Sequence, residues 1–573
     1  MKTLNVFRAR SEKKSANTRI VVEGRRKATG GRANGRIAIA MVMIFGVYAA
    51  IGGRLVQLGM VEETAASLPE VRPTASRPDI VDRNGEVLAT DIKTASLFAE
   101  PRRIVDVDEA IEQLRTVLPD LNYGEVYRRL SSDAGFVWLR RQLSPRQQSQ
   151  ILALGVPGLG FRTETRRFYP GGSTASHILG LVDIDNKGIA GIEKYIDNQG
   201  LADLQALGLA GPETLNPVRL SIDSRAQFVM HDELTRAMER YRAIAAGGVI
   251  LKADTGEVMA MVSLPDYDPN KPDNALDKDR LNRMSGGVFE MGSTFKLFTT
   301  AMALDSGKVN LSSSFDATHP IRLGGFTIND YHGKRRVLTV PEIFIYSSNI
   351  GTAKMADVVG IEGHRNFLKR VGLLERMQTE LPEVARPTEP KQWKKLNSVT
   401  ISFGHGVATT PLQTAASAAA MLNGGKLLQP TFLPRSEEEA ASLAQQVISP
   451  EASSQMRYLF RLNVEDRRGS GKNAEVEGYR VGGKTGTAEK VVNGRYSNDK
   501  RFNAFVAGFP ASDPEYLVLV ILDEPKPEEG KYYATAGLNT APTVANIIRR
   551  TAPFLGVQPD FGHEGEALMV SYQ

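Results

Sequence analysis

A serine and a lysine three residues apart have the spacing of a nucleophile and its base. Ser293 and Lys296 lie in Glu290–Leu304, EMGSTFKLFTTAMAL, whose apolar run predicts a buried helix. Residues i and i+3 share one face of a helix, so the two side chains can touch. Burial disfavours an ammonium group and lowers its pKa. A neutral lysine beside a serine can take its proton, and the pair therefore predicts a nucleophilic serine.

The spacing by itself is weak evidence for such chemistry. The pattern S-x-x-K also occurs at Ser11–Lys14, in a charged tail, and at Ser497–Lys500, beside a predicted turn. A lysine with a buried stem and an ammonium that reaches water is the ordinary alternative. Ser293 differs because its helix is apolar and because two further polar motifs follow it along the chain.

These two motifs can supply hydrogen bonds and positive charge. The first is S-x-N at Ser347 and Asn349, and the second is the stretch 482–488, GGKTGTA. Glycines let a ligand approach a strand closely, and threonines two residues apart present their hydroxyls on one face. Two such hydroxyls beside a cation can hold a carboxylate. The candidate residues of the second motif are Lys484, Thr485, Gly486 and Thr487.

A nucleotide site is the competing interpretation of the second motif. Residues 478–485, GYRVGGKT, match G-x-x-x-x-G-K-[ST], the loop that surrounds phosphates. That loop needs a buried strand before it and a helix after it. Glu475-Val476-Glu477 does not predict a buried strand, and Gly486 and Asn493-Gly494 interrupt a helix. This context disfavours nucleotide binding. If the chain did bind nucleotides, it should bind ATP saturably and lose that binding in Lys484→Ala.

Composition and charge narrow the classes of function. The chain is 42% hydrophobic and 24% charged, as globular proteins are, and it contains no cysteine, which excludes disulfides and thiolate chemistry. Residues 1–36 carry 11 Lys and Arg against two Glu, whereas the rest of the chain has a net charge of −3. The basic character therefore belongs to the tail, and this argues against a broad nucleic-acid surface on the folded body.

The tail leads into a candidate membrane anchor. Residues 37–53 are a 17-residue run without a charge, and apolar residues continue beyond Arg54 to Leu58. The run predicts a transmembrane helix over 37–58 whose preceding basic residues keep the N-terminus in the cytoplasm. A cleaved signal peptide and a buried core helix are the alternatives. The long leader and the late, poor cleavage site at Ala65-Ala66-Ser67 disfavour a signal peptide.

The remaining pattern predicts two folded units. Residues 62–219 mix short strands, helices and turns, with a hairpin turn at Asp82–Gly85. From residue 220, a hairpin over 247–264 precedes a mostly helical middle, and strands at 502–509 and 516–522 precede a helix over 540–555. Strands from both ends and helices from the middle favour one antiparallel sheet flanked by helices. The fold class is therefore α+β and multidomain, with a second unit over 220–556 and a tail over 557–573.

The ordered trio S-x-x-K, S-x-N and K-T-G is the pattern of serine β-lactamases and penicillin-binding proteins. Nearly the whole chain resembles a class B penicillin-binding protein, a monofunctional peptidoglycan D,D-transpeptidase. Met291 stands where the family usually has proline, and Pro78 where glycine is common. The segments that carry the resemblance outside the trio are Asp82–Gly85, Arg167–Pro170, His177, Gly191–Glu193, Gly404–Gly406 and Thr410–Gln413.

The resemblance implies a role for each candidate residue. Ser293 attacks the penultimate D-Ala of a stem peptide, and Lys296 takes its proton. Backbone N–H groups of Ser293 and Thr487 form the oxyanion hole, and β-lactams trap Ser293. No metal, nucleotide or other cofactor is implied. The remaining roles are protonation of the leaving D-Ala by Ser347, backbone binding by Asn349, positive charge from Lys484, and carboxylate binding by Thr485 and Thr487 beside Gly486.

The resemblance also implies partners and a location. Within the family the chain is most similar to the septal, cell-division enzyme, and the side-wall elongation enzyme is the near alternative. The implied partners are peptidoglycan stem peptides, a glycan polymerase of the shape-elongation-division-sporulation (SEDS) family and other division proteins, without nucleic acid. The implied location is the inner membrane at the septum, with the catalytic domain in the periplasm. A deacylating β-lactamase or carboxypeptidase and a sensor or scaffold without turnover remain alternatives.

Overall fold

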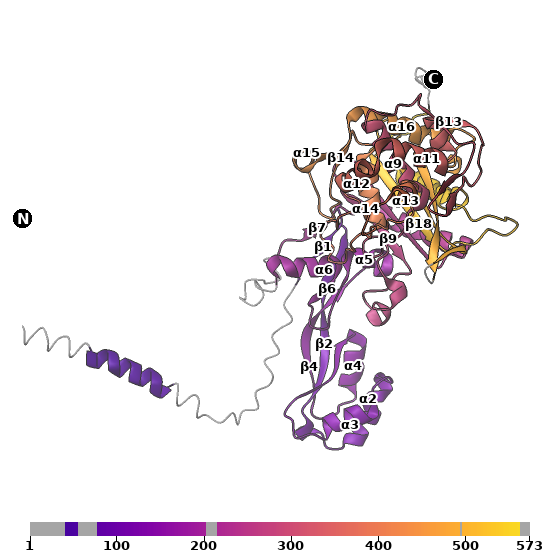
Figure 1. The fold of residues 1–573 in the computed structure, drawn as a ribbon. Coiled ribbons are helices and arrows are strands. Elements are labelled where there is room, and N and C mark those ends of the chain that lie inside the picture. Colours follow the sequence, from indigo (N-terminus) through magenta and orange to yellow (C-terminus); the bar gives the residue numbers. More distant parts are fainter. Residues whose placement is uncertain (1–40, 55–76, 202–214, 493–494, 562–573) are drawn as a thin grey trace, which may run out of the picture.

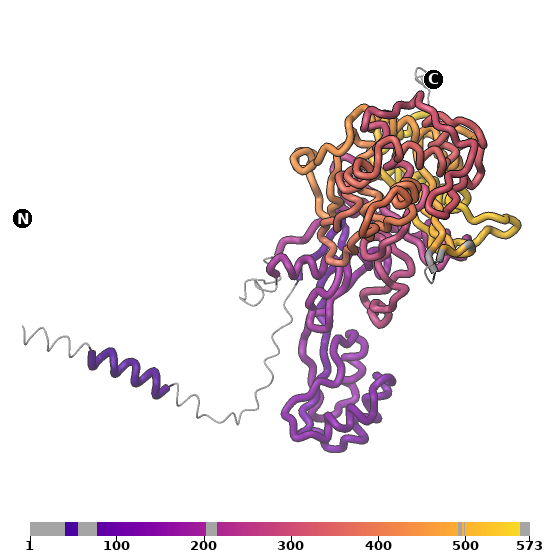
Figure 2. The backbone as a smooth tube through the Cα atoms, in the orientation of Figure 1, coloured from indigo at the N-terminus to yellow at the C-terminus, as the bar shows by residue number. Residues whose placement is uncertain are grey.

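The computed structural model describes residues 41–54, 77–201, 215–492 and 495–561. Figures 1 and 2 show an elongated pedestal, residues 77–201 and 215–219, leading away from a larger C-terminal body. Residues 41–54 are helical, and the rest of the predicted anchor, 37–40 and 55–58, lies outside the described residues, as do the basic tail and residues 562–573. Among the described helices none is long and apolar enough to cross a membrane.

The 13-residue strand β2 (Val87–Ala99) forms the spine of the pedestal. β1 (Ile80–Val81) and β2 pair antiparallel on either side of the predicted turn, which is thereby confirmed. Asp82 closes this turn by accepting hydrogen bonds from Asn84 N at 2.7 Å and Glu86 N at 2.9 Å. The other strands of the sheet are β3 (Val137–Leu143), β4 (Leu159–Phe168) and β7 (Val218–Arg219).

Helices begin at capping residues in the pedestal. The side chains of Asp106, Asn122 and Ser144 each accept a hydrogen bond from the first turn of the helix that follows. Apolar side chains of these helices and of β2 form a separate small core. The helices are α2 (Val107–Val117), α3 (Tyr123–Leu130) and α4 (Pro145–Ala153), with short α5 (Ser176–Leu179) and α6 (Gly191–Ile196) nearer the body.

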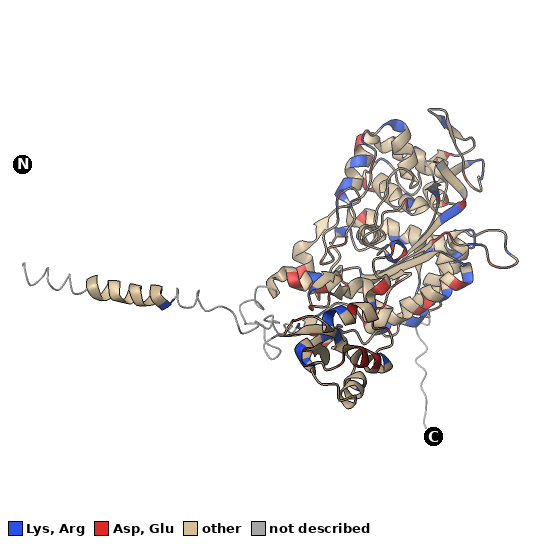
Figure 3. Ribbon diagram, turned by 90° about the horizontal axis from the view of Figure 1, so that it is seen from below, with Lys and Arg blue, Asp and Glu red and all other residues tan. Residues whose placement is uncertain are grey.

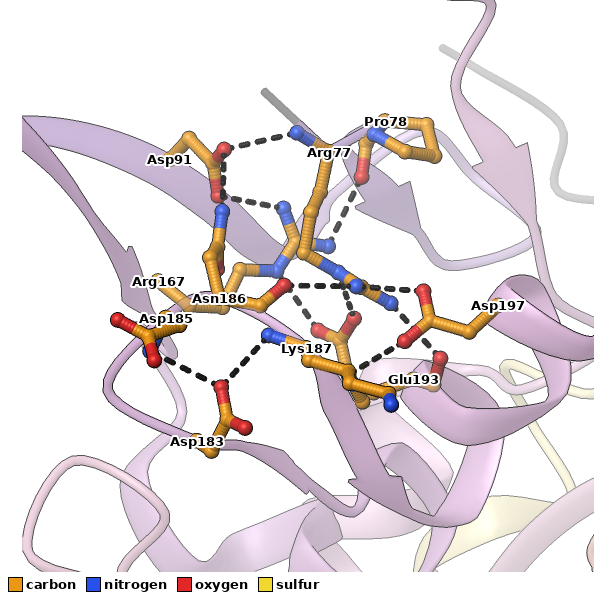
Figure 4. Close-up of polar contacts among 11 residues, drawn as sticks. Arg77, Pro78, Asp91, Arg167, Asp183, Asp185, Asn186, Lys187, Glu193 and Asp197 are labelled. Carbon is orange, nitrogen blue, oxygen red and sulfur yellow. Dashed lines mark hydrogen bonds and ion pairs between the residues drawn. The ribbon is translucent and has the colours of Figure 1, made fainter. Parts of the chain in front are cut away.

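A buried ion-pair network joins the chain segments at the base of the pedestal. Figure 4 shows two arginines converging on Glu193, which is 0% exposed. Arg77 Nε lies 2.8 Å from Glu193 Oε2, and Arg167 Nε lies 2.7 Å from Glu193 Oε1. Arg77 also pairs with Asp197 at 2.6 Å, and Arg167 with Asp91 at 3.1 Å. Because these residues come from distant parts of the chain, the network fixes how β2, β4 and α6 meet.

The C-terminal body is built on one antiparallel sheet, as predicted. Its strand order is β16-β17-β18-β8-β9, so strands from the beginning and end of the body are neighbours. The central strand β18, YLVLVILD, is apolar up to its last residue, Asp523, because both of its faces are covered. The strands are β8 (Ala245–Lys252), β9 (Val258–Leu264), β16 (Gly482–Val492), β17 (Arg495–Phe509) and β18 (Tyr516–Asp523).

Two sets of helices cover the two faces of this sheet. α8 (Ser224–Tyr241) and α17 (Thr540–Thr551) pack on one face, where Val518 and Val520 point. The larger set packs on the other face, where Leu517 and Leu519 point. This set includes α9 (Phe295–Asp305), α10 (Val340–Ile345), α11 (Asn349–Val359), α12 (Ile361–Arg370), α13 (Lys395–Ser402), α14 (Pro411–Ala420) and α16 (Pro450–Glu465).

The middle of the body is less helical than predicted. Four short strands interrupt it between α9 and α10 and form two small two-stranded sheets. Their three-residue length and their mixture of exposed and half-buried residues leave little periodic signal in the sequence. They are β10 (Ser314–Asp316), β11 (Ile321–Leu323), β12 (Phe326–Ile328) and β13 (Val337–Thr339).

The pedestal and the body share apolar packing where they meet. Ile80, Ile178 and Ile192 of the pedestal belong to the same buried cluster as Phe295 of the body. Acidic and basic residues are interspersed along the ribbon of the body (Figure 3). This distribution agrees with the near-neutral charge of the chain beyond the basic tail.

Candidate active site

Ser293 lies in a one-turn 3-10 helix, Gly292–Thr294, immediately before α9. Two glycines, Gly292 and Gly404, allow this turn to pack closely against the segments on either side of it. Gly292 has φ 53°, and a Cβ there would lie 2.8 Å from Thr487 O. A Cβ on Gly404 would lie 1.9 Å from Gly292 O, closer than any side chain permits. The serine is therefore held between strand β16 and the turn at Gly404.

Lys296, in the first turn of α9, is 1% exposed. Burial lowers its pKa to about 7, and the negative charge of Asp330 partly opposes that shift. The Nζ atom donates hydrogen bonds to Ser347 O and, at 3.1 Å, to Ser347 Oγ. Among the described residues the hydrogen bonds of this ammonium go to Ser347, 51 residues along the chain, and not to Ser293.

Ser347 lies between two buried lysines. Lys484 Nζ donates to Ser347 Oγ at 2.9 Å and to Thr485 O at 3.2 Å. Lys484 is 0% exposed, and burial together with the nearby Lys296 holds its pKa well below the ordinary lysine value. Ser347 itself has φ 54°, a left-handed conformation that non-glycine residues rarely adopt. A hydroxyl so placed can exchange protons with either amine.

The S-x-N motif is tied to a loop that the sequence did not single out. Asn349 Nδ2 donates to Asn329 O at 2.8 Å. Asp330 accepts from Ser348 Oγ at 2.8 Å and from Ile350 N at 3.0 Å, so its carboxylate caps the start of α11. Lone polar residues in loops carry no periodic signal, and only the fold brings Asp330 to the motif.

The K-T-G motif lies on strand β16, which pairs with β17 from Gly482 to Glu489. Thr485 Oγ1 donates to Ser470 Oγ at 2.8 Å, and Thr487 Oγ1 accepts from Ala536 N at 3.2 Å. Gly486 allows close packing, because a Cβ there would lie 2.5 Å from Met291 O. A strand follows Lys484 where a phosphate-binding loop requires a helix, so the structure contradicts the nucleotide alternative.

A second polar cluster lies beside the nucleophile turn. Glu290 accepts hydrogen bonds from Gly406 N at 2.8 Å and from Tyr496 OH at 3.3 Å. His405 Nδ1 lies 3.4 Å from Glu290 Oε2. These contacts link the turn before Ser293 to the hairpin between β16 and β17. Neither Glu290 nor Tyr496 was predicted as a site residue, since their association depends on tertiary structure.

Two protein families match the chain. Residues 246–549 match the penicillin binding protein transpeptidase domain, and residues 72–211 match the penicillin-binding protein dimerisation domain. The chain is 39% identical to the "Probable peptidoglycan D,D-transpeptidase FtsI" of Caulobacter vibrioides over 491 residues, 84% of this chain and 82% of the relative.

Two further relatives cover a similar share of the chain at lower identity. The "Peptidoglycan D,D-transpeptidase FtsI" of Escherichia coli (strain K12) is 29% identical over 519 residues, 86% of each chain. The "Stage V sporulation protein D" of Bacillus subtilis (strain 168) is 32% identical over 520 residues, 84% of this chain and 79% of the relative. The chain belongs to the penicillin-binding protein transpeptidase family and carries a dimerisation domain ahead of its transpeptidase domain.

Proposed function

We propose that this protein is a septal, FtsI-like peptidoglycan D,D-transpeptidase that cross-links stem peptides through a serine acyl-enzyme and binds penicillins. The observation that carries the proposal is the Ser347 hydroxyl between the buried amines of Lys296 and Lys484, with Ser293 three residues before Lys296. Such a set can activate a nucleophile and protonate a leaving amine without a metal or cofactor.

In the acylation step Ser293 Oγ attacks the carbonyl carbon of the penultimate D-Ala. The proton of Ser293 passes to Lys296, whose pKa burial lowers to about 7, so that a large fraction of the amine is neutral at that pH. Backbone N–H groups of Ser293 and Thr487 stabilise the oxyanion, a contribution of about 10²–10³ in rate for each donor. The peptide C–N bond then breaks, and the departing amine of D-Ala takes a proton from Ser347 Oγ, which the adjacent lysines replace.

In the second step an amine of a neighbouring stem peptide attacks the acyl-enzyme. Its nitrogen forms the new amide bond, it loses a proton to the same lysine and serine groups, and Ser293 leaves with its hydroxyl restored. Asn349 binds the peptide backbone, Lys484 contributes charge, and Thr485 and Thr487 beside Gly486 bind the terminal carboxylate of the donor. β-Lactams enter by the first step and form an ester that hydrolyses slowly.

Membership of this family also supports a proposal for the domain boundaries and for the cellular location. We propose a cytoplasmic tail over 1–36, a membrane anchor over 37–58, a non-catalytic pedestal over 62–219, a periplasmic transpeptidase domain over 220–556 and a short C-terminal tail. The names of the FtsI relatives favour division over elongation. A SEDS-family glycan polymerase and other division proteins are the proposed partners at the septum.

The experiment that tests the function uses the full chain in detergent with a fluorescent penicillin, beside Ser293→Ala. Stable labelling of the parent and none of the variant is the expected result. Labelling that decays rapidly would instead indicate a β-lactamase-like hydrolase. Absence of labelling in a folded parent would favour a scaffold without turnover. Equal labelling of parent and variant would exclude Ser293 as the nucleophile.

Asp330→Asn tests the loop that holds the S-x-N motif. We expect acylation by penicillin to slow about tenfold, because Ser348 and Ile350 lose a charged acceptor. The negative charge of Asp330 raises the pKa of Lys296, so its removal should move the rise of the pH–rate profile to lower pH. Stopped-flow acylation across pH measures both effects.

The control for this variant is Asp357→Asn, which removes an exposed carboxylate on α11, 3.0 Å from Lys395. We expect its acylation rate and pH profile to match those of the parent. A pH profile that does not move in Asp330→Asn would contradict the electrostatic part of the argument, and an unchanged rate would contradict the positioning part.

A further inference from the structure

Ser470 is a polar residue close to the K-T-G motif for which the mechanism above has no role. It lies in the loop between α16 and the 3-10 turn η7 (Lys472–Ala474). Its hydroxyl accepts a hydrogen bond from Thr485 Oγ1 at 2.8 Å and donates to Asn463 Oδ1 at 3.1 Å. A chain of side-chain hydrogen bonds therefore runs from Thr485 through Ser470 to Asn463.

The backbone around Ser470 is held firmly between both halves of the site. Asn463 is 0% exposed, accepts Ser470 N at 3.0 Å and donates to Gly483 O at 2.7 Å. Ser470 N also lies 3.2 Å from Ile345 O, at the end of the helix that leads to Ser347. A Cβ on Gly537 would lie 2.7 Å from Ser470 O. Ser470 thus connects the S-x-N side of the site to the K-T-G side.

The two threonines of the motif differ in how their hydroxyls are engaged. Thr487 Oγ1 accepts from Ala536 N, and its hydrogen is left for a ligand. Thr485 Oγ1 instead donates its hydrogen to Ser470. A carboxylate only accepts hydrogen bonds, so Thr485 can bind one only after its hydrogen turns away from Ser470.

We propose that Ser470 is a positioning residue for recognition of the donor's terminal carboxylate, because it reverses its hydrogen bond with Thr485 when the carboxylate binds. This inference rests on the proposed function, in which Thr485 binds that carboxylate. When Thr485 donates to the ligand, the Ser470 hydroxyl turns and donates to Thr485 Oγ1. Asn463 Oδ1 keeps its bond from Ser470 N, so the change leaves no buried acceptor unpaired.

The reversed hydrogen bond from Ser470 to Thr485 also strengthens the binding of the carboxylate by Thr485. A hydroxyl that accepts one hydrogen bond becomes a better donor in the next, so Ser470 makes Thr485 a stronger partner for an anion. Hydrogen bonds to charged acceptors contribute more than neutral ones, so the effect should appear with ligands that carry a carboxylate. Ligands without that charge should be nearly insensitive to Ser470.

The test compares acylation of the full chain in detergent by benzylpenicillin and by its methyl ester, which lacks the carboxylate charge. We expect Ser470→Ala to lower the second-order acylation rate constant for penicillin about tenfold and that for the ester less than about twofold. The ratio of the two constants is independent of the fraction of folded enzyme. Ser470→Thr, which keeps the hydroxyl, should restore most of the ratio.

Two further variants complete the design. Thr485→Val should lower the same ratio, and the double variant with Ser470→Ala should lower it no further, because both changes remove one hydrogen-bond chain. Ser132→Ala is the control, since that pedestal hydroxyl only donates to Arg129 O at 2.7 Å, and its ratio should equal that of the parent.

Each outcome is distinguishable. Equal losses with penicillin and with the ester leave the ratio unchanged, and they would assign Ser470 a purely structural role and overturn the proposal. Additive losses in the double variant would overturn it as well. Failure of the proposed function itself would appear elsewhere, as labelling of Ser293→Ala or as no labelling of the parent.

Discussion

Lys296→Met is expected to slow acylation by penicillin by about 10²–10⁴-fold, the range that a positioned general base contributes. The loss follows from the position of Lys296, the amine nearest to Ser293 in the chain, whose Nζ contacts Ser347. Methionine has a similar length and no charge, so it fills the buried site without leaving a cavity or an unpaired ammonium. The measurement is the second-order acylation rate constant of the full chain.

The pH dependence of the acylation rate of the parent enzyme also tests whether Lys296 is the general base. Lys296 is a base only when neutral, and its pKa of about 7 means that it is mostly protonated below that pH. Acylation should therefore rise with pH with a midpoint at about 7 and level off above it, and this rise should be absent from Lys296→Met. An ordinary exposed lysine would place the rise near pH 10.

Lys308→Met is the matched control for both measurements. Lys308 is an exposed residue just beyond the end of α9, and its Nζ lies 3.4 Å from Val358 O. We expect its rate and pH profile to equal those of the parent. A rise with the same midpoint in Lys296→Met would assign the titration to another group and would contradict the role of Lys296 as the base.

Periodic and local signals explain which parts of the fold were predictable. The hairpins at Asp82–Gly85 and between β8 and β9 follow from turn residues flanked by apolar runs, and the structure confirms both. The antiparallel sheet followed from strands at both ends of the body. The strands β10 to β13 were missed because three-residue segments carry too little pattern to separate them from loops.

The candidate site was predictable as residue types but not as contacts. The S-x-x-K, S-x-N and K-T-G motifs are visible in the sequence, yet the partner of Lys296 is Ser347, 51 residues away. That contact joins α9 to the turn before α11, and only the tertiary fold brings these two segments together. Asp330 and Ser470 are single polar residues in loops, and no local rule connects them to motifs elsewhere in the chain.

Arg167→Met should destabilise the pedestal by about 3–5 kcal/mol, the usual result of removing one partner from a buried ion pair. Glu193 is 0% exposed and Asp91 lies 3.1 Å from Arg167, so neither carboxylate can turn to water for compensation (Figure 4). After the substitution the guanidinium of Arg77 still pairs with Glu193 and Asp197, whereas Asp91 keeps only neutral donors, such as Arg77 N, in the described part of the chain. Asp91 therefore loses its ion pair, and Glu193 loses one of its two arginines.

Denaturant unfolding of the full chain in detergent, followed by tryptophan fluorescence, measures this effect, since Trp138 lies in the pedestal strand β3. Arg103→Met is the control, because Arg103 pairs with Glu100 at the surface, where ion pairs contribute at most about 1 kcal/mol. A loss in Arg167→Met no larger than in the control would show that the network adds little to stability. Among the described residues, the Arg167 side chain bonds to Glu193, Asp91 and Pro78, all within the pedestal, so acylation of Ser293 should persist until the pedestal unfolds.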